Sequence, residues 1–487
     1  MPKSKHSKFK SHKAKLRRTR GKTAPLGLDD PSAVPNKSWT SYWSFLFAAI
    51  GSAVGLGNIW KFPYELGLHG GGTFLVVYIP CVFLIALPLM MSEIMIGRSG
   101  RANPVHAVRR IAKRQKLSSV WQSMGWLGMI AGFLVFSFYS VVGSWVLFYI
   151  MQSATGSFVD VPAEIVQHSF GALLRNTDQQ LIWHGIFVLI VVTVLSRRLR
   201  FGLQLALKVL MPCFLALLVW LCVFATQVGD FDRAITFFTT VDFSAINAEL
   251  MVSALTQALF SLSIGLGALI MFGSYLGEHR PIATAAGIVM VFDTAIALTM
   301  GLLIFSIVFA FGMRPDSGAG LIFETLPVAF SQMSQNSVLW STLFFTLVGV
   351  AALTSGFALL EPSIAWMIRQ FRVSRPLAAW FMGTLAWLVG VLCIYSFNDM
   401  SFSFYYFGIQ RTNGLFDFLN ILTTNVLMPL TAILVTIFAG WRISSADSRA
   451  AMAIPINLVY RVWRFCTRML VPTVLALVLI VVLLYPA

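Results

Sequence analysis

The feature that most constrains this chain is a series of apolar stretches that are each long enough to cross a membrane. A helix of ~20 apolar residues spans the hydrocarbon core of a bilayer. We expect eleven transmembrane helices, at about residues 39–66, 71–98, 118–152, 182–200, 201–226, 250–276, 282–312, 339–369, 376–397, 415–441 and 468–485. The chain is 57% hydrophobic and 11% charged, which is more apolar surface than a soluble core of this size can bury. The sequence therefore predicts an all-α integral membrane protein.

Basic residues are distributed unevenly along the chain, whose formal net charge is +17. Residues 1–22 contain ten Lys or Arg and no acidic residue. Basic loops also follow the second, fourth, eighth and tenth expected spans, whereas the alternate loops carry acidic residues. Short loops rich in Lys and Arg face the cytoplasm. We therefore expect a multi-pass protein of the cell (inner) membrane, with a cytoplasmic N-terminus and a C-terminus outside.

The basic tail at residues 1–38 allows two interpretations. A basic arm can bind nucleic acid. The alternative is a disordered cytoplasmic tail near anionic lipid, where each basic residue close to the surface contributes roughly 1 kcal/mol. We favour the lipid interpretation and expect no nucleic-acid partner. Because no apolar core follows the basic residues directly, we expect no cleavable signal peptide.

Residue types that often carry chemistry give no sign of an enzyme. The seven histidines are scattered without the spacing of a metal site or a catalytic triad. The five cysteines are odd in number and fall in or beside apolar spans, so we expect free thiols. The cysteines are Cys81, Cys213, Cys222, Cys393 and Cys466. We expect no catalytic residue.

Two expected helices contain glycine-rich polar interruptions. Residues 51–58 read GSAVGLGN in the first span, and residues 260–267 read FSLSIGLG in the sixth. Glycine lowers helix propensity by ~1 kcal/mol, and unwound backbone in a membrane is tolerated where it lines a cavity. Gly51 and Gly55 alone would also fit close packing of helices through small residues. Two interruptions five spans apart favour an inverted repeat with a binding site at the midplane.

The interruptions suggest how the chain is organised. A first five-helix repeat is expected at 39–226 and a second at 250–441, with an extracellular loop at 227–249 between them. Residues 442–487 would form a cytoplasmic loop and the eleventh helix. The expected fold class is thus an inverted five-plus-five helix repeat with unwound first and sixth helices.

Adjacent hydroxyls in the eighth span suggest a cation site. Thr354 and Ser355 lie in the apolar stretch GVAALTSGFALLEP. Such hydroxyls often bond back to the preceding helical turn, which needs no functional explanation. The alternative is a site for sodium, which as a hard cation takes oxygen ligands. Carbonyl groups freed by a helix break can complete such a site.

The sequence resembles the neurotransmitter:sodium symporter family over residues 39–441. The resemblance is carried by GSAVGLGNIWKFP, GGGTFLVVYIP, PLMMSEIMIGR, FSLSIGLG and LTSGFALLEP. It implies two sodium sites. One would use the carbonyls of Gly51, Val54 and Ala351 and the hydroxyls of Thr354 and Ser355. The other would use Ala53, Asn58, Ser261 and Asp293, where the family usually has asparagine in place of Asp293.

The resemblance also implies a site for an amino acid. The carboxylate would meet Leu56, Gly57 and the Tyr139 hydroxyl, and the amine would meet groups near Ala53, Phe260 and Ser263. The remaining pocket residues would be Val135, Ser261, Leu266, Ser355 and Leu359. Family members that carry monoamines have aspartate at position 55, whereas this chain has Gly55. Because an unpaired charge is costly to bury, we expect an apolar amino acid with its own carboxylate.

Several positions depart from the family pattern. The outer gate usually pairs an arginine with an acid; here the positions are Lys61 and, approximately, Asp417. The inner gate also usually pairs an arginine with an acid, but the positions here are Asn36 and Arg369, which cannot form that pair. Tyr275 and Ser274 match the residues that support the inner gate.

Three acids within expected spans need separate interpretations. Glu93 and Glu361 are either functional or accept hydrogen bonds from unwound backbone, which we favour. Asp293 suggests that transport does not require chloride, because a fixed carboxylate there would repel a second anion. The resemblance maps the family's chloride neighbourhood to Tyr78, Gln257 and Ser261, and Ala297 replaces its usual serine. Asp293 as a simple sodium ligand is the alternative.

These inferences converge on a sodium-coupled symporter that imports an amino acid by alternating access. The expected partners are the amino acid, sodium and the lipid bilayer, and the protein would be a monomer or a homodimer. A membrane sensor is a second class of function, but the chain has no recognisable signalling domain. An ion channel is a third, but it would not need a closed pocket between two broken helices.

Overall fold

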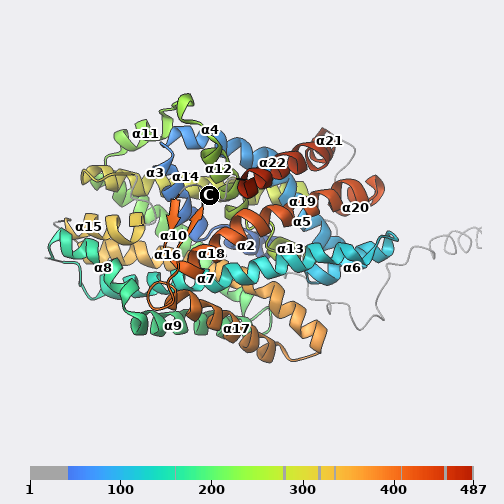
Figure 1. Cartoon of the computed structure of the whole chain (residues 1–487), viewed down its shortest axis with the longest axis horizontal. Helices are drawn as coiled ribbons and strands as arrows, with labels where there is room; N and C mark the ends of the chain where they lie inside the picture. Colours follow the sequence, from blue (N-terminus) through green and yellow to red (C-terminus); the bar gives the residue numbers. More distant parts are fainter. Residues whose placement is uncertain are drawn as a thin grey trace, which may run out of the picture. The chain divides into compact units, whose positions relative to one another are not determined.

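The computed structural model describes residues 42–159, 161–277, 281–315, 320–333, 336–406, 409–453 and 458–484. The expected tail at 1–38, including Asn36, lies outside the described residues. The described part is helical apart from one short antiparallel hairpin (Figure 1). The chain therefore builds its described structure from helices, as the apolar pattern predicts.

The elements follow the chain in this order, with η marking short helical segments of tighter or wider winding. The first half contains α2 (Tyr42–Ala53), η2 (Gly57–Lys61), α3 (Phe62–Leu68), α4 (Gly72–Cys81), η3 (Val82–Ala86), α5 (Leu87–Gly100), α6 (Pro104–Arg114), η4 (Ser119–Trp121), α7 (Gln122–Ala154), α8 (Ala163–Arg175), α9 (Thr177–Ser196), α10 (Leu203–Val228), α11 (Phe231–Thr239) and η5 (Phe243–Ala245).

The second half begins with another interrupted helix. It contains α12 (Ala248–Ser261), α13 (Ala268–Ser274), α14 (Ile282–Ala310), η6 (Leu321–Thr325), α15 (Leu326–Ser331), α16 (Ser337–Phe371), α17 (Arg375–Tyr395), β1 (Phe404–Tyr406), β2 (Ile409–Arg411), α18 (Gly414–Ile421), η7 (Leu422–Leu427), α19 (Met428–Ile437), η8 (Phe438–Arg442), α20 (Ser445–Met452), α21 (Leu458–Phe465), η9 (Cys466–Leu470) and α22 (Val471–Leu484). The hairpin pairs Phe404 with Arg411.

Nine continuous helical stretches of the described chain are long and apolar enough to cross a bilayer. They match expected spans two to five and seven to eleven. The first expected span is a pair, α2 and η2–α3, bent by 47° at its break. The sixth is divided into α12, with 14 residues, and α13, with 7. The described helices thus give nine spans, or ten with the bent pair, and the expected count of eleven depends on joining α12 to α13.

The last span begins earlier than the sequence predicts. The expected start was residue 468, but the helix that ends in α22 begins at Leu458. Three arginines interrupt the apolar pattern there, at positions 461, 464 and 468. In the structure Arg464 and Arg468 donate to the carbonyls of Ala439 and Gly440, so they pack against η8 within a continuous helix.

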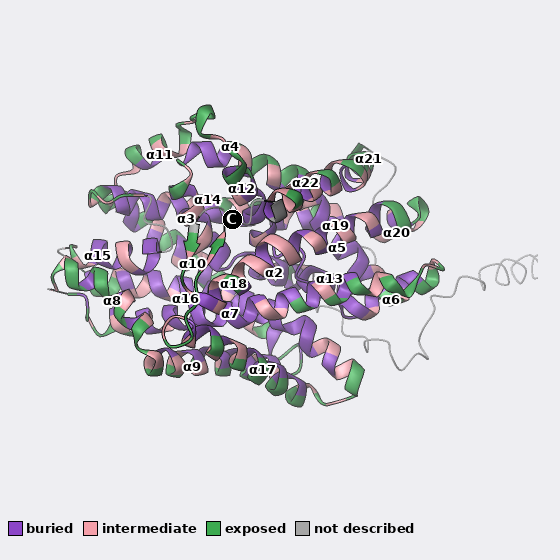
Figure 2. Ribbon diagram, in the orientation of Figure 1, coloured by how far each residue is buried: buried purple, intermediate pink, exposed green. Residues whose placement is uncertain are grey.

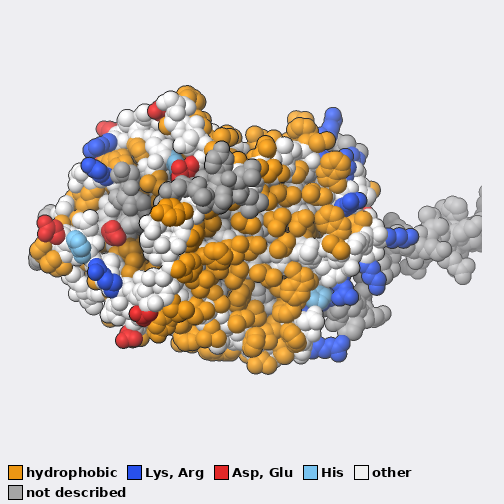
Figure 3. Space-filling model, in the orientation of Figure 1, with side chains coloured by type: hydrophobic (Ala, Val, Ile, Leu, Met, Phe, Trp, Pro, Cys, Tyr) orange, Lys and Arg blue, Asp and Glu red, His pale blue; other side chains and the backbone are white. Residues whose placement is uncertain are grey.

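Burial separates central helices from peripheral ones. In their most apolar stretches, 83% of the α16 residues and 78% of the α7 residues are buried, against 28% for the last span. Figure 2 shows the buried residues concentrated between the outer helices. Apolar residues on those outer helices are exposed, for example Val219, Phe381 and Leu388. The face of the molecule in Figure 3 carries a broad hydrophobic zone. A zone of this kind is the surface that a bilayer would cover.

Candidate functional site

The first break is a short non-helical turn held by its own polar groups. The helix α2 ends at Ala53, and the next helical turn begins at Gly57. The Asn58 side chain accepts a hydrogen bond from the amide of Gly55 at 3.4 Å. At Gly55 a Cβ atom would overlap the hydroxyl of Ser355 on α16. Only glycine therefore lets the break approach α16 this closely without rearrangement.

The second break lies at residues 262–267 between α12 and α13. Gly265 and Gly267 have φ angles of 78° and 74°, a left-handed conformation that favours glycine. Glu93 on α5 accepts a hydrogen bond from the Gly265 amide at 2.8 Å. This contact is the one expected for Glu93, because it satisfies a backbone donor that the break leaves without a helical partner.

The two breaks are joined directly. Ser263 in the second break donates to the carbonyl of Ser52 at 2.8 Å. Gln257 on α12 donates to the carbonyl of Gly57 at 2.9 Å. The interruptions, 200 residues apart in sequence, therefore face one another at a single place in the bundle.

A small cavity lies where the two breaks meet α7 and α16. Its walls are Ser52, Ala53, Gly55, Leu56, Gly57, Val135, Tyr139, Phe260, Ser263, Leu266, Ser355 and Leu359. The structure thus brings together every residue predicted to contact substrate except Ser261, whose hydroxyl turns away to Asp293. The polar groups gather on one side, where the Tyr139 hydroxyl accepts from the Leu56 amide at 3.4 Å. The opposite walls, including Val135, Leu266 and Leu359, are apolar.

The first predicted sodium position is a cluster of oxygen atoms between α16 and the first break. Ser355 Oγ lies 3.3–3.4 Å from the carbonyl oxygens of Gly51, Ser52 and Val54. Thr354 Oγ1 lies 3.0 Å from the carbonyl of Ala351 and 3.5 Å from that of Val54. All these atoms are neutral oxygens, the ligand type that a hard cation prefers. The residues present therefore fit a sodium ion.

The second predicted sodium position is built around a buried carboxylate. Asp293 on α14 is fully buried. Its two oxygens accept from Asn58 Nδ2 at 2.8 Å and from Ser261 Oγ at 2.6 Å. Both donors are neutral, and no basic side chain of the described residues forms an ion pair with Asp293. An uncompensated buried carboxylate is costly, so a cation bound beside it would supply the missing charge.

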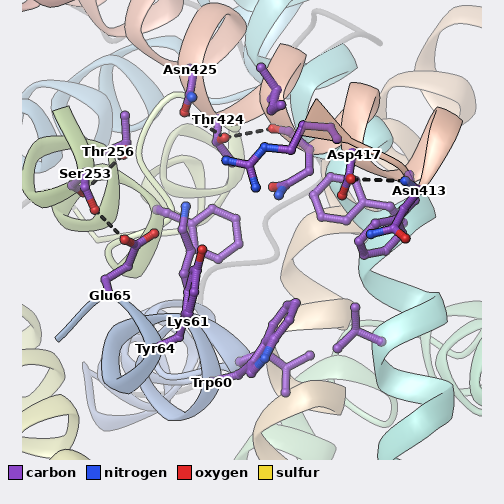
Figure 4. Close-up of a pocket in the computed structure, with 18 of the residues that line it drawn as sticks. Trp60, Lys61, Tyr64, Glu65, Ser253, Thr256, Asn413, Asp417, Thr424 and Asn425 are labelled. Carbon is purple, nitrogen blue, oxygen red and sulfur yellow. Dashed lines mark hydrogen bonds between the residues drawn. The ribbon is translucent and has the colours of Figure 1, made fainter. Parts of the chain in front are cut away.

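A vestibule of about 350 Å³ adjoins the small cavity and shares Leu56, Tyr139 and Phe260 with it. Lys61 and Asp417 both line it, but no ion pair joins these two described residues (Figure 4). The Lys61 ammonium lies over the ring of Phe260 at 4.8 Å, while Asp417 accepts from the Asn413 amide. In this conformation the two predicted gate residues stand apart.

The vestibule contains polar residues that the sequence analysis did not single out. Glu65 accepts a hydrogen bond from Ser253, and Arg411 of the hairpin also lines the wall. Glu65 lies four residues after Lys61, one helical turn further along the same face. That spacing is the one sequence signal that could have predicted Glu65 as a vestibule residue. Nothing local in the sequence predicts that the hairpin places Arg411 there.

Glu361 has different partners from those predicted. It accepts two hydrogen bonds from the Arg375 guanidinium, at 3.0 and 2.5 Å, and one from Tyr275 at 3.3 Å. The interpretation that it satisfies unwound backbone is therefore wrong. Arg375 was missed because the sequence places it in a basic loop, where its reach back to α16 cannot be seen. It also donates to the carbonyls of Leu195 and Arg197, so it ties the end of α9 and the start of α17 to α16.

Comparison with known proteins identifies the class to which this site belongs. The model of the sodium:neurotransmitter symporter family matches residues 36–171 and 174–486. A chain that matches over this length belongs to that family, so the protein is a membrane transporter and not an enzyme.

Individual relatives agree with the family assignment. An uncharacterized sodium-dependent transporter of Bacillus subtilis, YhdH, is 33% identical over 447 residues, which cover 90% of this chain and 96% of the relative. One from Methanocaldococcus jannaschii is 30% identical over 428 residues, 84% of this chain and 82% of the relative. The crystal structure of MhsT in complex with L-phenylalanine superposes with a TM-score of 0.83 at 32% identity, covering 91% of this chain and 99% of that one.

Proposed function

We propose that the protein is a sodium-coupled symporter that imports an apolar amino acid by alternating access. The observation that carries this proposal is the small cavity, whose polar side faces the first break and whose other walls are apolar. Amide groups at the start of η2 and the Tyr139 hydroxyl suit a carboxylate. The described lining has no charged side chain, which disfavours an amino acid whose own side chain is charged. The complex of MhsT with L-phenylalanine is consistent with this substrate class.

Two sodium ions would couple to the amino acid. One would bind among Gly51, Val54, Ala351, Thr354 and Ser355. The other would bind among Ala53, Asn58, Ser261 and Asp293, next to the expected carboxylate of the substrate. Sodium and substrate would then favour the same state, and each would raise the affinity for the other.

The proposed transport does not require chloride. The fixed charge of Asp293 would offset the neighbouring sodium, and an additional anion a few ångströms away would be repelled. Ala297 has no hydroxyl to offer a chloride ion. Gln257, which the resemblance places in the chloride neighbourhood, uses its amide nitrogen to bind the carbonyl of Gly57.

The proposed topology keeps eleven spans. It counts α2 with η2–α3 as the first span and α12 with α13 as the sixth, and it assigns the repeats to 39–226 and 250–441. The N-terminus would lie in the cytoplasm, and the C-terminus would lie outside the inner membrane. Two contacts support the placement of the basic loops at one end of the bundle. Arg375 binds the carbonyl of Arg197, and Arg442 lies over the ring of Trp121.

Gating would differ at the two ends of the cavity. At the outer end, Lys61 and Asp417 would approach one another when the vestibule closes. At the inner end, the buried Glu361–Arg375 pair would hold α16 to α17, and Tyr275 at the end of α13 would bind to it. Closure would then depend on a hydroxyl from α13, where other family members use an arginine and an acid.

A thermal-shift screen of the twenty amino acids tests the substrate proposal. The purified protein is measured in sodium chloride, sodium gluconate and potassium chloride. We expect stabilisation by apolar amino acids, in both sodium salts and not in potassium. Stabilisation by a charged amino acid alone, or equal stabilisation in potassium, would refute the proposal as stated.

A further inference from the structure

The end of the bundle that carries α6, α20 and α21 concentrates positive charge without matching acids. Figure 3 shows Lys and Arg gathered there, beyond the hydrophobic zone. After Asp417 the chain has five arginines, no lysine and one acid, Asp447. The arginines are Arg442, Arg449, Arg461, Arg464 and Arg468. We call this set the arginine rim.

The single acid near the arginine rim is already engaged. Asp447 accepts hydrogen bonds from Gln115 at 2.5 Å and from Ser444 at 2.8 Å. These hydrogen bonds hold the pKa of its carboxyl below the usual value. No carboxylate among the described residues forms an ion pair with any arginine of the rim. The rim therefore needs an external anion to balance its charge.

Three arginines of the rim form a column on one side of the last helix. Arg461, Arg464 and Arg468 are spaced by three and four residues, which places them on one helical face. Arg468 and Arg464 are fixed by carbonyls of Gly440, Ala439 and Ile443 at the end of η8. Arg461, one turn further toward the basic end, is exposed. The column thus leads from the bundle to the surface.

Aromatic rings lie against two members of the arginine rim. Arg442 and Arg468 lie over the rings of Trp121 and Trp441, at 5.8 and 5.7 Å. Trp441 is 55% exposed, and tryptophan is enriched at the interface between membrane and water. Stacking of this kind orients a guanidinium while leaving its N–H groups free to bind an oxyanion.

The length of the last helix suggests that the arginine rim lies at the depth of the lipid headgroups. The helix from Leu458 to Leu484 has 27 residues, or about 40 Å at 1.5 Å per residue. The hydrocarbon core takes only ~20 of them, so the first turns, with Arg461 and Arg464, extend into the headgroup layer. Exposed Phe465 and Met469, further along the same helix, would contact the acyl chains.

We propose that the arginine rim binds the phosphodiester group of an anionic phospholipid. Arg442 and Arg461, the two exposed members, would contact the phosphate, since guanidinium groups bind phosphate oxygens in a bidentate manner. Arg464 and Arg468 would add charge from fixed positions. The proposal requires only that the protein lies in a membrane, so it is independent of which substrate is transported.

Lipid titration of the delipidated full-length protein tests this proposal. Native mass spectrometry would measure binding of phosphatidylglycerol and of phosphatidylcholine with the same acyl chains. We expect at least a tenfold preference for phosphatidylglycerol in the wild type. The double variant Arg442→Gln, Arg461→Gln should lose most of that preference. The matched control Arg197→Gln, Arg200→Gln removes two exposed arginines elsewhere on the protein and should keep it.

Three results would overturn the proposal. The first is equal binding of the two lipids by the wild type. The second is an unchanged preference in the double variant, with the amino-acid thermal shift showing that it is folded. The third is that inorganic phosphate at the same concentration competes fully with phosphatidylglycerol, which would indicate a general anion site. Partial or no competition is expected, because acyl contacts contribute to lipid binding.

Discussion

The two proposed sodium positions lie on the same broken helix but differ in their chemistry. The position beside α16 offers only neutral oxygens, from Thr354, Ser355 and carbonyl groups. The position beside α14 contains Asp293, a buried carboxylate held by Asn58 and Ser261. A neutral site gains its affinity from the number and geometry of its dipoles, whereas a charged site gains it from one dominant electrostatic interaction. Mutations at the two positions should therefore change the sodium requirement by different amounts.

The largest effect should come from introducing a carboxylate into the first break, next to the neutral sodium position and the small cavity. Gly55→Asp would place a carboxylate beside the expected carboxylate of the substrate, and like charges in a dry site repel strongly. We expect amino-acid binding to be lost, as measured by radioligand binding in saturating sodium. Gly55→Ala controls for size alone, because its Cβ would also overlap the Ser355 hydroxyl; we expect it to weaken binding less than Gly55→Asp does. Wild-type affinity in a folded Gly55→Asp protein would place the substrate elsewhere.

Removing the charge at the other position should have the next largest effect. Asp293→Asn keeps the shape of the side chain but leaves a bound sodium uncompensated. Loss of a buried charge partner costs about 3–5 kcal/mol, so the sodium concentration for half-maximal substrate binding should rise roughly 100-fold or more. The control variant Asp447→Asn, outside the cavity, should leave this sodium concentration unchanged. A sodium requirement equal to that of the wild type would mean that Asp293 does not face a cation.

The neutral position should respond more weakly. Thr354→Ala with Ser355→Ala removes two hydroxyl ligands but no charge. Each lost hydrogen-bond-like contact costs about 1 kcal/mol, so the half-maximal sodium concentration should rise roughly 10-fold to 30-fold. Ser363→Ala, a buried hydroxyl further along α16, is the matched control. If the double variant raises the half-maximal sodium concentration as much as Asp293→Asn does, the contrast between the two positions does not hold.

The smallest effect should arise at the inner end, away from both sodium positions. Tyr275→Phe removes the hydroxyl that donates to Glu361 while leaving the Glu361–Arg375 pair intact. Loss of one hydrogen bond costs about 1 kcal/mol. We expect a change of roughly threefold to tenfold in the rate of uptake, with little change in equilibrium sodium affinity. A variant with a wild-type rate would remove Tyr275 from the gate.

The sequence predicts most of the helices from local signals, whereas the lining of the cavity is predicted only through the family motifs. Apolar length fixes most spans, and glycines mark both breaks. The register of the family motifs predicts Val135, Phe260 and Leu359 as pocket residues, and all three line the small cavity. These residues lie far apart in the chain, and without the motifs each would have been indistinguishable from ordinary core.

Contacts between distant polar side chains were harder to predict. The prediction for Glu361 is hydrogen bonding to unwound backbone, but in the structure it accepts hydrogen bonds from Arg375, 14 residues later. The start of the last helix was misplaced for a related reason, since Arg464 and Arg468 are accommodated by carbonyls of η8. In both cases a charged side chain finds a partner across the bundle that hydropathy alone does not reveal.

The central claim is that sodium drives the uptake of an amino acid, and flux across a membrane tests it most directly. The protein is reconstituted into liposomes, and uptake of the labelled amino acid found in the thermal-shift screen is measured with and without an inward sodium gradient. Gluconate replaces all chloride in a parallel set. We predict accumulation above equilibrium only with the sodium gradient, at the same rate in gluconate. Binding without accumulation, or uptake that ignores the gradient, would contradict the account.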